Sequence, residues 1–202
     1  MFGLLLPALL AVLVALALGG SLGGWARVGV RGWPAAVGSF GTLLVVYNPP
    51  VNRLDGAIHW GPAIWVACEL VFLAVLLANA SAPGSTLRPR LAWLVAALGV
   101  SLNTLTIIAN GGSMPVSTAA PAWISEQSAD GHRLHNTTPM TSETRLSWLG
   151  DVFLEPAWFP PRPNAVSVGD LLLSLGLAGW AFQTTLAAGR RSPVWLGGEG
   201  LA

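Results

Sequence analysis

Two carboxylic acids in the second half of the chain are the residues best placed to do chemistry. Asp151 follows a Leu-Gly pair, and Asp170 closes the run SVGD, which begins at Ser167. If the fold brings the two acids together, they could act as an acid–base pair or hold a metal ion. The alternative is structural, because a serine followed three residues later by an acid forms a capping box at the start of a helix. Both interpretations stay open, and the capping box is the one that we favour.

Glu69 and Asn103 are polar residues inside long apolar runs. A carboxylate in the membrane interior is costly, so such a residue is usually functional or well paired. In two antiparallel helices, a rise of ~1.5 Å per residue would place Glu69 roughly 13 Å and Asn103 roughly 10 Å below the outer interface. We therefore predict that the two helices touch and that Glu69 hydrogen-bonds to Asn103, directly or through water. Thr104 or Thr106 is the alternative partner.

A further candidate is the histidine pair in the stretch GHRLHN, His132 and His135. On a helix the two rings would share a face and could bind zinc, but the sequence offers no obvious third ligand. We therefore expect this stretch to be a solvated loop.

The composition of the chain indicates which elements position these residues. Hydrophobic residues make up 53% of the 202 residues, charged residues make up only 9%, and the formal net charge is +1. A soluble domain carries roughly a quarter of charged residues, so we predict an all-α integral membrane protein. The near-neutral charge and the lack of a basic patch argue against a nucleic-acid partner. All ten basic residues are Arg, which is typical of GC-rich bacterial genomes and favours a bacterial plasma membrane.

We predict about five transmembrane helices in a single membrane domain that covers residues 1–202. A helix needs about 20 apolar residues to cross the hydrocarbon layer. Four runs meet this requirement, whereas the second is weakened by Pro34, Arg31 and several glycines. The first run could also be a signal peptide, but it lacks the usual basic residue before its apolar core, so we expect a retained helix. The predicted spans are residues 2–18, 28–47, 60–80, 91–110 and 166–188.

The arginines predict how the chain is threaded. With five spans, three arginine pairs lie on one side, which is the cytoplasmic side by the positive-inside rule. The N-terminus is then outside and the C-terminus is cytoplasmic. Residues 111–165 form an extracytoplasmic loop that ends in the Pro-rich stretch PAWFPPRPN, before the last helix. The bias is incomplete, because the four other arginines fall outside. The three pairs are Arg27 with Arg31, Arg88 with Arg90, and Arg190 with Arg191.

The stretch ANGGSMPVS marks the outer end of the fourth span. Asn110 is expected to end the helix, and Gly111 and Gly112 can adopt the left-handed conformation that closes it. Pro115 prevents the helix from resuming, and Ser117 is expected to begin a short surface segment that runs to residue 127. The alternative is a binding role, because two glycines at the interface expose main-chain N–H groups to an anion or a lipid headgroup.

Small and polar residues recur at steps of three and four in the fourth span and in the last span. Such stripes are typical of helices that pack closely against other helices. They comprise Ala92, Ala96, Gly99, Asn103, Thr106 and Asn110 in the fourth span, and Gly176, Gly179, Gln183 and Ala187 in the last.

Three blocks in fixed order, NGG-MPVS, LGD and SVGD, resemble those of a family of small bacterial multi-pass membrane proteins known only as a domain of unknown function. The resemblance covers residues 91–176 and implies no activity, substrate or cofactor, so the cofactor is unknown. The positions that it singles out are Asn110, Gly111, Gly112, Met114, Pro115, Leu149, Gly150, Asp151, Ser167, Gly169 and Asp170.

Three classes of function stay open. The first is a non-catalytic membrane protein, such as an accessory subunit, an assembly factor or a lipid-binding scaffold, and it is the class that we expect. The second is a small membrane enzyme that acts on a lipid-linked substrate at the outer face through Asp151 and Asp170. The third is a proton-coupled carrier that uses Glu69. The expected partners are the lipid bilayer and, in the first class, another membrane protein or complex.

Overall fold

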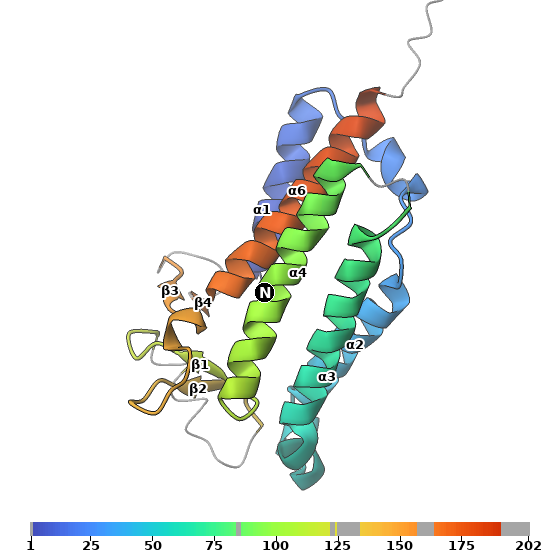
Figure 1. Ribbon diagram of the computed structural model, residues 1–202. Coiled ribbons are helices and arrows are strands. Elements are labelled where there is room, and N and C mark those ends of the chain that lie inside the picture. Colours follow the sequence, from blue (N-terminus) through green and yellow to red (C-terminus); the bar gives the residue numbers. More distant parts are fainter. Residues whose placement is uncertain (1, 84–85, 122–123, 125–133, 157–163, 191–202) are drawn as a thin grey trace, which may run out of the picture.

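Helices form at all five positions where the sequence predicts apolar spans (Figure 1). The computed structural model describes residues 2–83, 86–121, 124, 134–156 and 164–190. The helices are α1 (Phe2–Ala17), α2 (Trp33–Val46), α3 (Asp55–Ala80), α4 (Leu87–Ala109) and α6 (Val168–Arg190). Short 3-10 turns occur at η1 (Leu22–Arg27), η2 (Val51–Arg53) and η3 (Ser147–Leu149).

The described part of the chain is mostly helical, as expected, but the segment between α4 and α6 also contains two small sheets that the prediction of an all-α protein did not include. Strand β1 (Met114–Val116) pairs in parallel with β2 (Thr137–Pro139), and β3 (Phe153–Leu154) pairs antiparallel with β4 (Ala165–Val166). Buried main-chain N–H and C=O groups need hydrogen-bond partners. A segment that packs on the ends of helices can satisfy these main-chain groups by forming hydrogen bonds between its own short strands.

Among the five helices named above, in the part of the chain that the structure describes, α3, α4 and α6 are long and apolar enough to cross a membrane. Helices α1 and α2 contain 16 and 14 residues. At ~1.5 Å per residue they extend roughly 21–24 Å, less than the ~30 Å of a typical hydrocarbon core. The structure is thus compatible with a membrane protein, whereas the five crossings and their orientation stay predictions.

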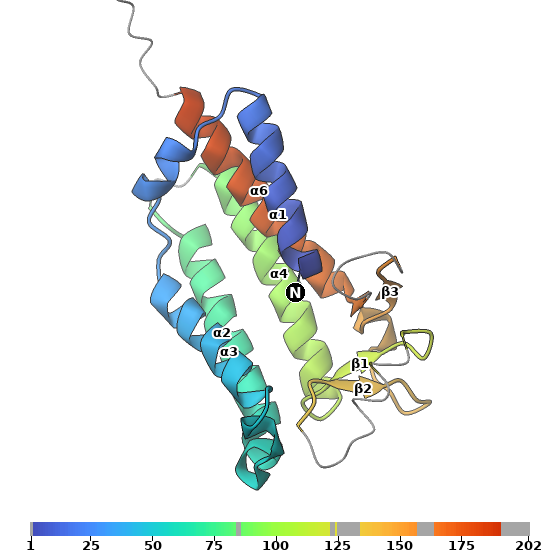
Figure 2. The ribbon, with the colours of Figure 1, turned by 180° about the vertical axis from the view of Figure 1, so that it is seen from behind.

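Helix α4 contacts both α3 and α6, so the predicted contact between the third and fourth spans is confirmed (Figures 1 and 2). Helix α2 packs on α3, and α1 packs on α6. Ser21, after α1, donates its main-chain N–H to the carbonyl of Thr185 near the end of α6 at 2.9 Å. Since the beginnings of α1 and α6 also line one groove, these two helices run in the same direction.

The buried core lies on both sides of α4. One cluster comprises Leu76 and Ala80 of α3 with Trp93, Ala96, Ala97 and Val100 of α4. On the other side, the predicted small-residue stripes face each other. A Cβ atom at Gly176 would lie 2.5 Å from the main-chain nitrogen of Ala96 and 2.6 Å from the carbonyl oxygen of Ala92. Only glycine fits there, which explains how α4 and α6 approach so closely.

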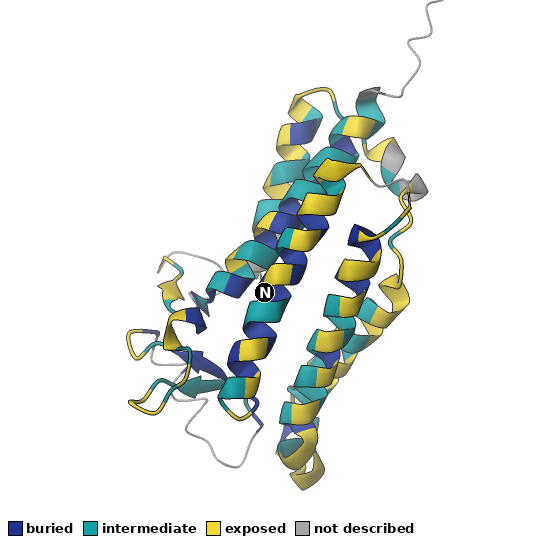
Figure 3. Cartoon of the chain, in the orientation of Figure 1, coloured by how far each residue is buried: buried dark blue, intermediate teal, exposed yellow. Residues whose placement is uncertain are grey.

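The outward faces of the helices are apolar and exposed (Figure 3). Leu13 of α1 is 61% exposed and Leu175 of α6 is 62% exposed, and α2 has no buried residue among its fourteen. A monomeric soluble protein rarely exposes so much contiguous apolar surface. These faces therefore suit a lipid environment.

Candidate functional site

The three sequence blocks meet at one end of α4 and α6. Asn110 follows the last residue of α4, and its side-chain amide donates to the carbonyls of Thr106 and Arg145, each at 2.8 Å. Its amide oxygen accepts the N–H of Arg145 at 2.9 Å. Asn110 therefore ends the helix, as predicted, and also fixes the loop that leads to the LGD block.

Two glycines close α4 in the way that the sequence predicts. Gly111 has φ +71° and Gly112 has φ +95°, both in the left-handed region. The N–H of Gly112 donates to the carbonyl of Ile107 at 2.8 Å. A Cβ atom at Gly112 would also collide with Pro62 of α3. These glycines are thus explained by the helix stop and by close packing.

The LGD block is joined to the MPVS block through the main chain. Asp151 donates its N–H to the carbonyl of Pro115 at 2.8 Å, and its own carbonyl accepts the N–H of Ser117 at 3.0 Å. Met114 and Pro115 are buried, and Gly150 lies against the Pro115 carbonyl, where a Cβ atom would be only 2.5 Å away. Residues far apart in the sequence thus form one rigid unit at the end of α4.

Ser167 and Asp170 form the predicted capping box at the start of α6. The hydroxyl of Ser167 accepts the N–H of Asp170 at 2.9 Å, and the carboxylate of Asp170 accepts the N–H of Ser167 at 3.0 Å. The same side chains also reach α4, because Asn103 donates to Asp170 at 2.9 Å and accepts the Ser167 hydroxyl proton at 2.8 Å. Gly169 packs directly on Asn103, and any side chain there would collide with it. The SVGD block is therefore both a cap and a clamp between two helices.

The direct hydrogen bond predicted between Glu69 and Asn103 is wrong, whereas a contact between them through water stays a prediction. Asn103 faces α6, and within the described part of the chain no hydrogen bond joins it to Glu69 of α3. The alternative partners, Thr104 and Thr106, donate to carbonyls of their own helix, Val100 and Leu102. Depth along a helix follows from the sequence, but the face that meets each neighbour depends on how the helices pack.

Asp151 has an unusual environment for an ionisable group outside the helices. Its Oδ1 atom is buried and has no hydrogen-bond partner among the described residues. Burial raises the pKa of the Asp151 carboxyl from 3.8 to about 8, and the negative charge of Asp170 adds to this effect. Asp151 is therefore protonated at neutral pH. The fold does bring the two acids into electrostatic range, although Asp170 is occupied by the capping box and the clamp.

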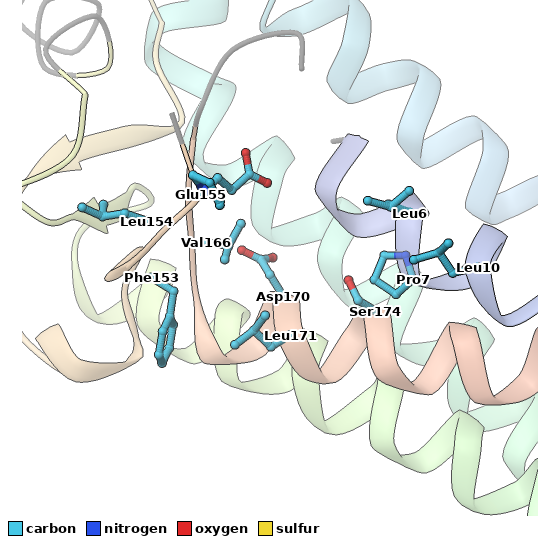
Figure 4. A pocket seen from close by; sticks show the side chains of 11 residues that line it. Leu6, Pro7, Leu10, Phe153, Leu154, Glu155, Val166, Asp170, Leu171 and Ser174 are labelled. Atoms are coloured by element: carbon cyan, nitrogen blue, oxygen red, sulfur yellow. The ribbon is translucent and has the colours of Figure 1, made fainter. Parts of the chain in front are cut away.

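A groove of about 440 Å³ lies beside this unit, between the beginning of α1, the β3–β4 pair and the first two turns of α6 (Figure 4). Its lining is apolar except for Ser174 and the carboxylates of Glu155 and Asp170. Asp151 does not line it. The lining residues are Leu6, Pro7, Leu10, Phe153, Leu154, Glu155, Pro156, Val166, Asp170, Leu171 and Ser174.

Sequence reasoning missed Glu155 and the groove. Glu155 follows the short strand β3 and has no motif around it, and the groove joins segments about 150 residues apart in the sequence. Other predictions cannot be followed in the structure. His132 and most of the Pro-rich stretch lie outside the described residues. Ser117 accepts the N–H of Ala119 at 3.2 Å, but most of the segment that it was predicted to begin also lies outside them.

No curated protein and no solved structure matches the chain. A family model does match, over residues 30–182, and this region contains the three blocks, Glu69 and Glu155 but not α1. Since the match covers most of the 202 residues, the chain belongs to a family of unknown function, DUF5317.

Proposed function

We propose that this chain is a non-catalytic membrane protein that binds the hydrocarbon chain of a lipid or similar amphiphile in the groove beside α6. The observation that carries this proposal is the groove itself, in which eight of the eleven lining residues are Leu, Pro, Phe or Val. Its volume of about 440 Å³ falls within the range of ligand pockets, roughly 300–1,000 Å³.

Burial of hydrocarbon supplies the driving force. Each methylene group that leaves water for an apolar environment contributes about 0.8 kcal/mol. Leu171 and Phe153 are 47% and 46% exposed, so their apolar surface is available to a chain lying in the groove. The clamp of Asn103, Ser167 and Asp170 holds the start of α6, which lines the groove, against α4, and this reduces the entropic cost of binding.

Acid–base catalysis is the competing interpretation, and the buried carboxyl of Asp151 beside Asp170 is the observation that favours it. Against it, Asp151 lies outside the groove lining. A substrate in the groove would therefore not contact both acids, so binding is the better supported function.

Five crossings, with the N-terminus outside and the groove at the outer end, are part of this proposal. Helix α2 begins beside the end of α3, because the side chain of Asn79 accepts the N–H of Arg31 at 2.9 Å. It ends beside the first half of α3, where Tyr47, the residue after α2, packs edge-on against Trp65 with ring centroids 4.9 Å apart. The chain thus reverses direction from each helix to the next, as five crossings require. The outer face of α2 is available to lipid or to another membrane protein.

Photo-crosslinking tests the proposal. The purified chain, in uncharged maltoside micelles, is irradiated with a dodecanol that carries a diazirine in its chain, and labelled peptides are identified by mass spectrometry. We expect labels in peptides that contain Phe153 or Leu171. Leu171→Trp fills the groove and should remove these labels, whereas Leu175→Trp, one turn further along α6 and outside the lining, should keep them. Labels that are unaffected by Leu171→Trp would contradict binding in the groove.

A further inference from the structure

The two ionisable groups among the residues lining the groove are both acids. Asp170 comes from the first turn of α6 and Glu155 from the residue after β3. Figure 4 shows their carboxylates among apolar side chains and the hydroxyl of Ser174, with Leu6, Pro7 and Leu10 of α1 close by. No arginine or histidine belongs to the lining, and in the described part of the chain neither acid forms an ion pair.

The hydrogen bonds of the two acids leave acceptor capacity for a ligand. Each oxygen of Asp170 accepts one hydrogen bond, from Asn103 and from the N–H of Ser167. Glu155 accepts the N–H of Asn164 at 3.0 Å through Oε2, and its Oε1 has no partner among the described residues. Since a carboxylate offers about four acceptor positions, both groups can bind a further donor.

Charge complementarity identifies the kind of ligand. A carboxylate or phosphate headgroup would be repelled by the two acids that line this apolar groove, whereas an ammonium group would be attracted and could donate up to three hydrogen bonds. We infer that the groove selects an amphiphile whose hydrocarbon chain ends in an ammonium group, with this group bound by Glu155 and Asp170. This inference rests on the proposed function and adds to it the chemical class of the headgroup.

The test uses three dodecyl probes with the same diazirine in the chain, ending in an ammonium, a hydroxyl or a carboxylate group. Crosslinking at groove peptides is normalised to crosslinking at α2, which corrects for partition into the micelle. We expect the ammonium probe to label the groove roughly five to ten times more than the carboxylate probe, as for a partly exposed charge pair. Glu155→Gln should reduce this ratio to about twofold, whereas Glu143→Gln, an exposed site outside the groove, should leave it unchanged.

The outcomes separate the inference from the function on which it rests. Equal labelling of the groove by the ammonium and carboxylate probes overturns the inference. If Leu171→Trp still removes that labelling, the proposed function, binding of a hydrocarbon chain in the groove, is nevertheless supported. Loss of groove labelling with all three probes overturns both. Arg162 is close to Glu155 in the sequence, so Arg162→Gln is included. If the preference for the ammonium probe is present only in Arg162→Gln, the positive charge that the two acids bind in the native chain is Arg162 and not a ligand, and the inference is overturned. An unchanged ratio in Arg162→Gln supports the inference.

Discussion

The protonated state of Asp151 predicts an unusual dependence of stability on pH. Its pKa is raised from 3.8 to about 8 in the folded protein, whereas in the unfolded chain it returns to its ordinary value. Between these two values the folded state holds a proton that the unfolded state has lost. The free energy of unfolding therefore falls as pH rises through this range, which is opposite to the behaviour of a carboxylate in a salt bridge.

The size of the effect follows from the linkage relation. One proton of difference changes the free energy of unfolding by about 1.4 kcal/mol per pH unit. From about pH 5 to about pH 8 the loss is on the order of 4 kcal/mol. For a chain of this size, that corresponds to a fall of roughly 10 °C in the thermal midpoint.

Thermal unfolding in detergent at several pH values, followed by circular dichroism, measures this slope. Asp151→Asn mimics the protonated acid, so it should lose this part of the slope and be more stable than the native chain at pH 9. Asp55→Asn, at an exposed position in the first turn of α3, is the matched control and should follow the native curve. If the native chain and Asp151→Asn show the same dependence on pH, Asp151 is not a buried neutral acid.

Three further predictions concern the clamp, the helix contact and the orientation. Ser167→Ala should cost about 1–3 kcal/mol in the free energy of unfolding, because a fully buried hydroxyl that both caps α6 and bonds to α4 is lost; an unchanged thermal midpoint would contradict the clamp. Gly176→Ala should prevent α4 and α6 from packing. Gly179→Ala should be tolerated, because its Cβ atom would meet its nearest neighbour at an ordinary 3.7 Å. Size-exclusion chromatography and thermal unfolding compare the two variants. In a chain without the native cysteine, Ser142→Cys should react with an impermeant thiol reagent in intact cells and Ser81→Cys should not; the reverse pattern would invert the proposed orientation.

The positions of the helices could be predicted because they depend on local properties of the chain. Runs of apolar residues predict where each helix lies, although α2 begins at Trp33 rather than at residue 28 and α3 begins at Asp55 rather than at residue 60. The stop at Gly111 and Gly112 follows from their freedom to adopt positive φ. The capping box of Ser167 and Asp170 involves residues three positions apart, so its hydrogen bonds are also local. The stripes of small residues correctly predicted that α4 packs closely against another helix, but they did not identify which one.

The sequence by itself determined the membrane-compatible class of this protein, the approximate positions of its helices, and the caps, because burial of apolar residues and main-chain hydrogen bonding within a few residues are local requirements. Tertiary structure alone decided that Asn103 meets Asp170, 67 residues away, rather than Glu69. It also decided that Asp151 is buried and that Glu155 joins Asp170 in an apolar groove. These features depend on the rotation of each helix about its axis and on the path of the loop between α4 and α6. Both are set by close packing among segments distant in the sequence, at contacts such as Gly176 against Ala96.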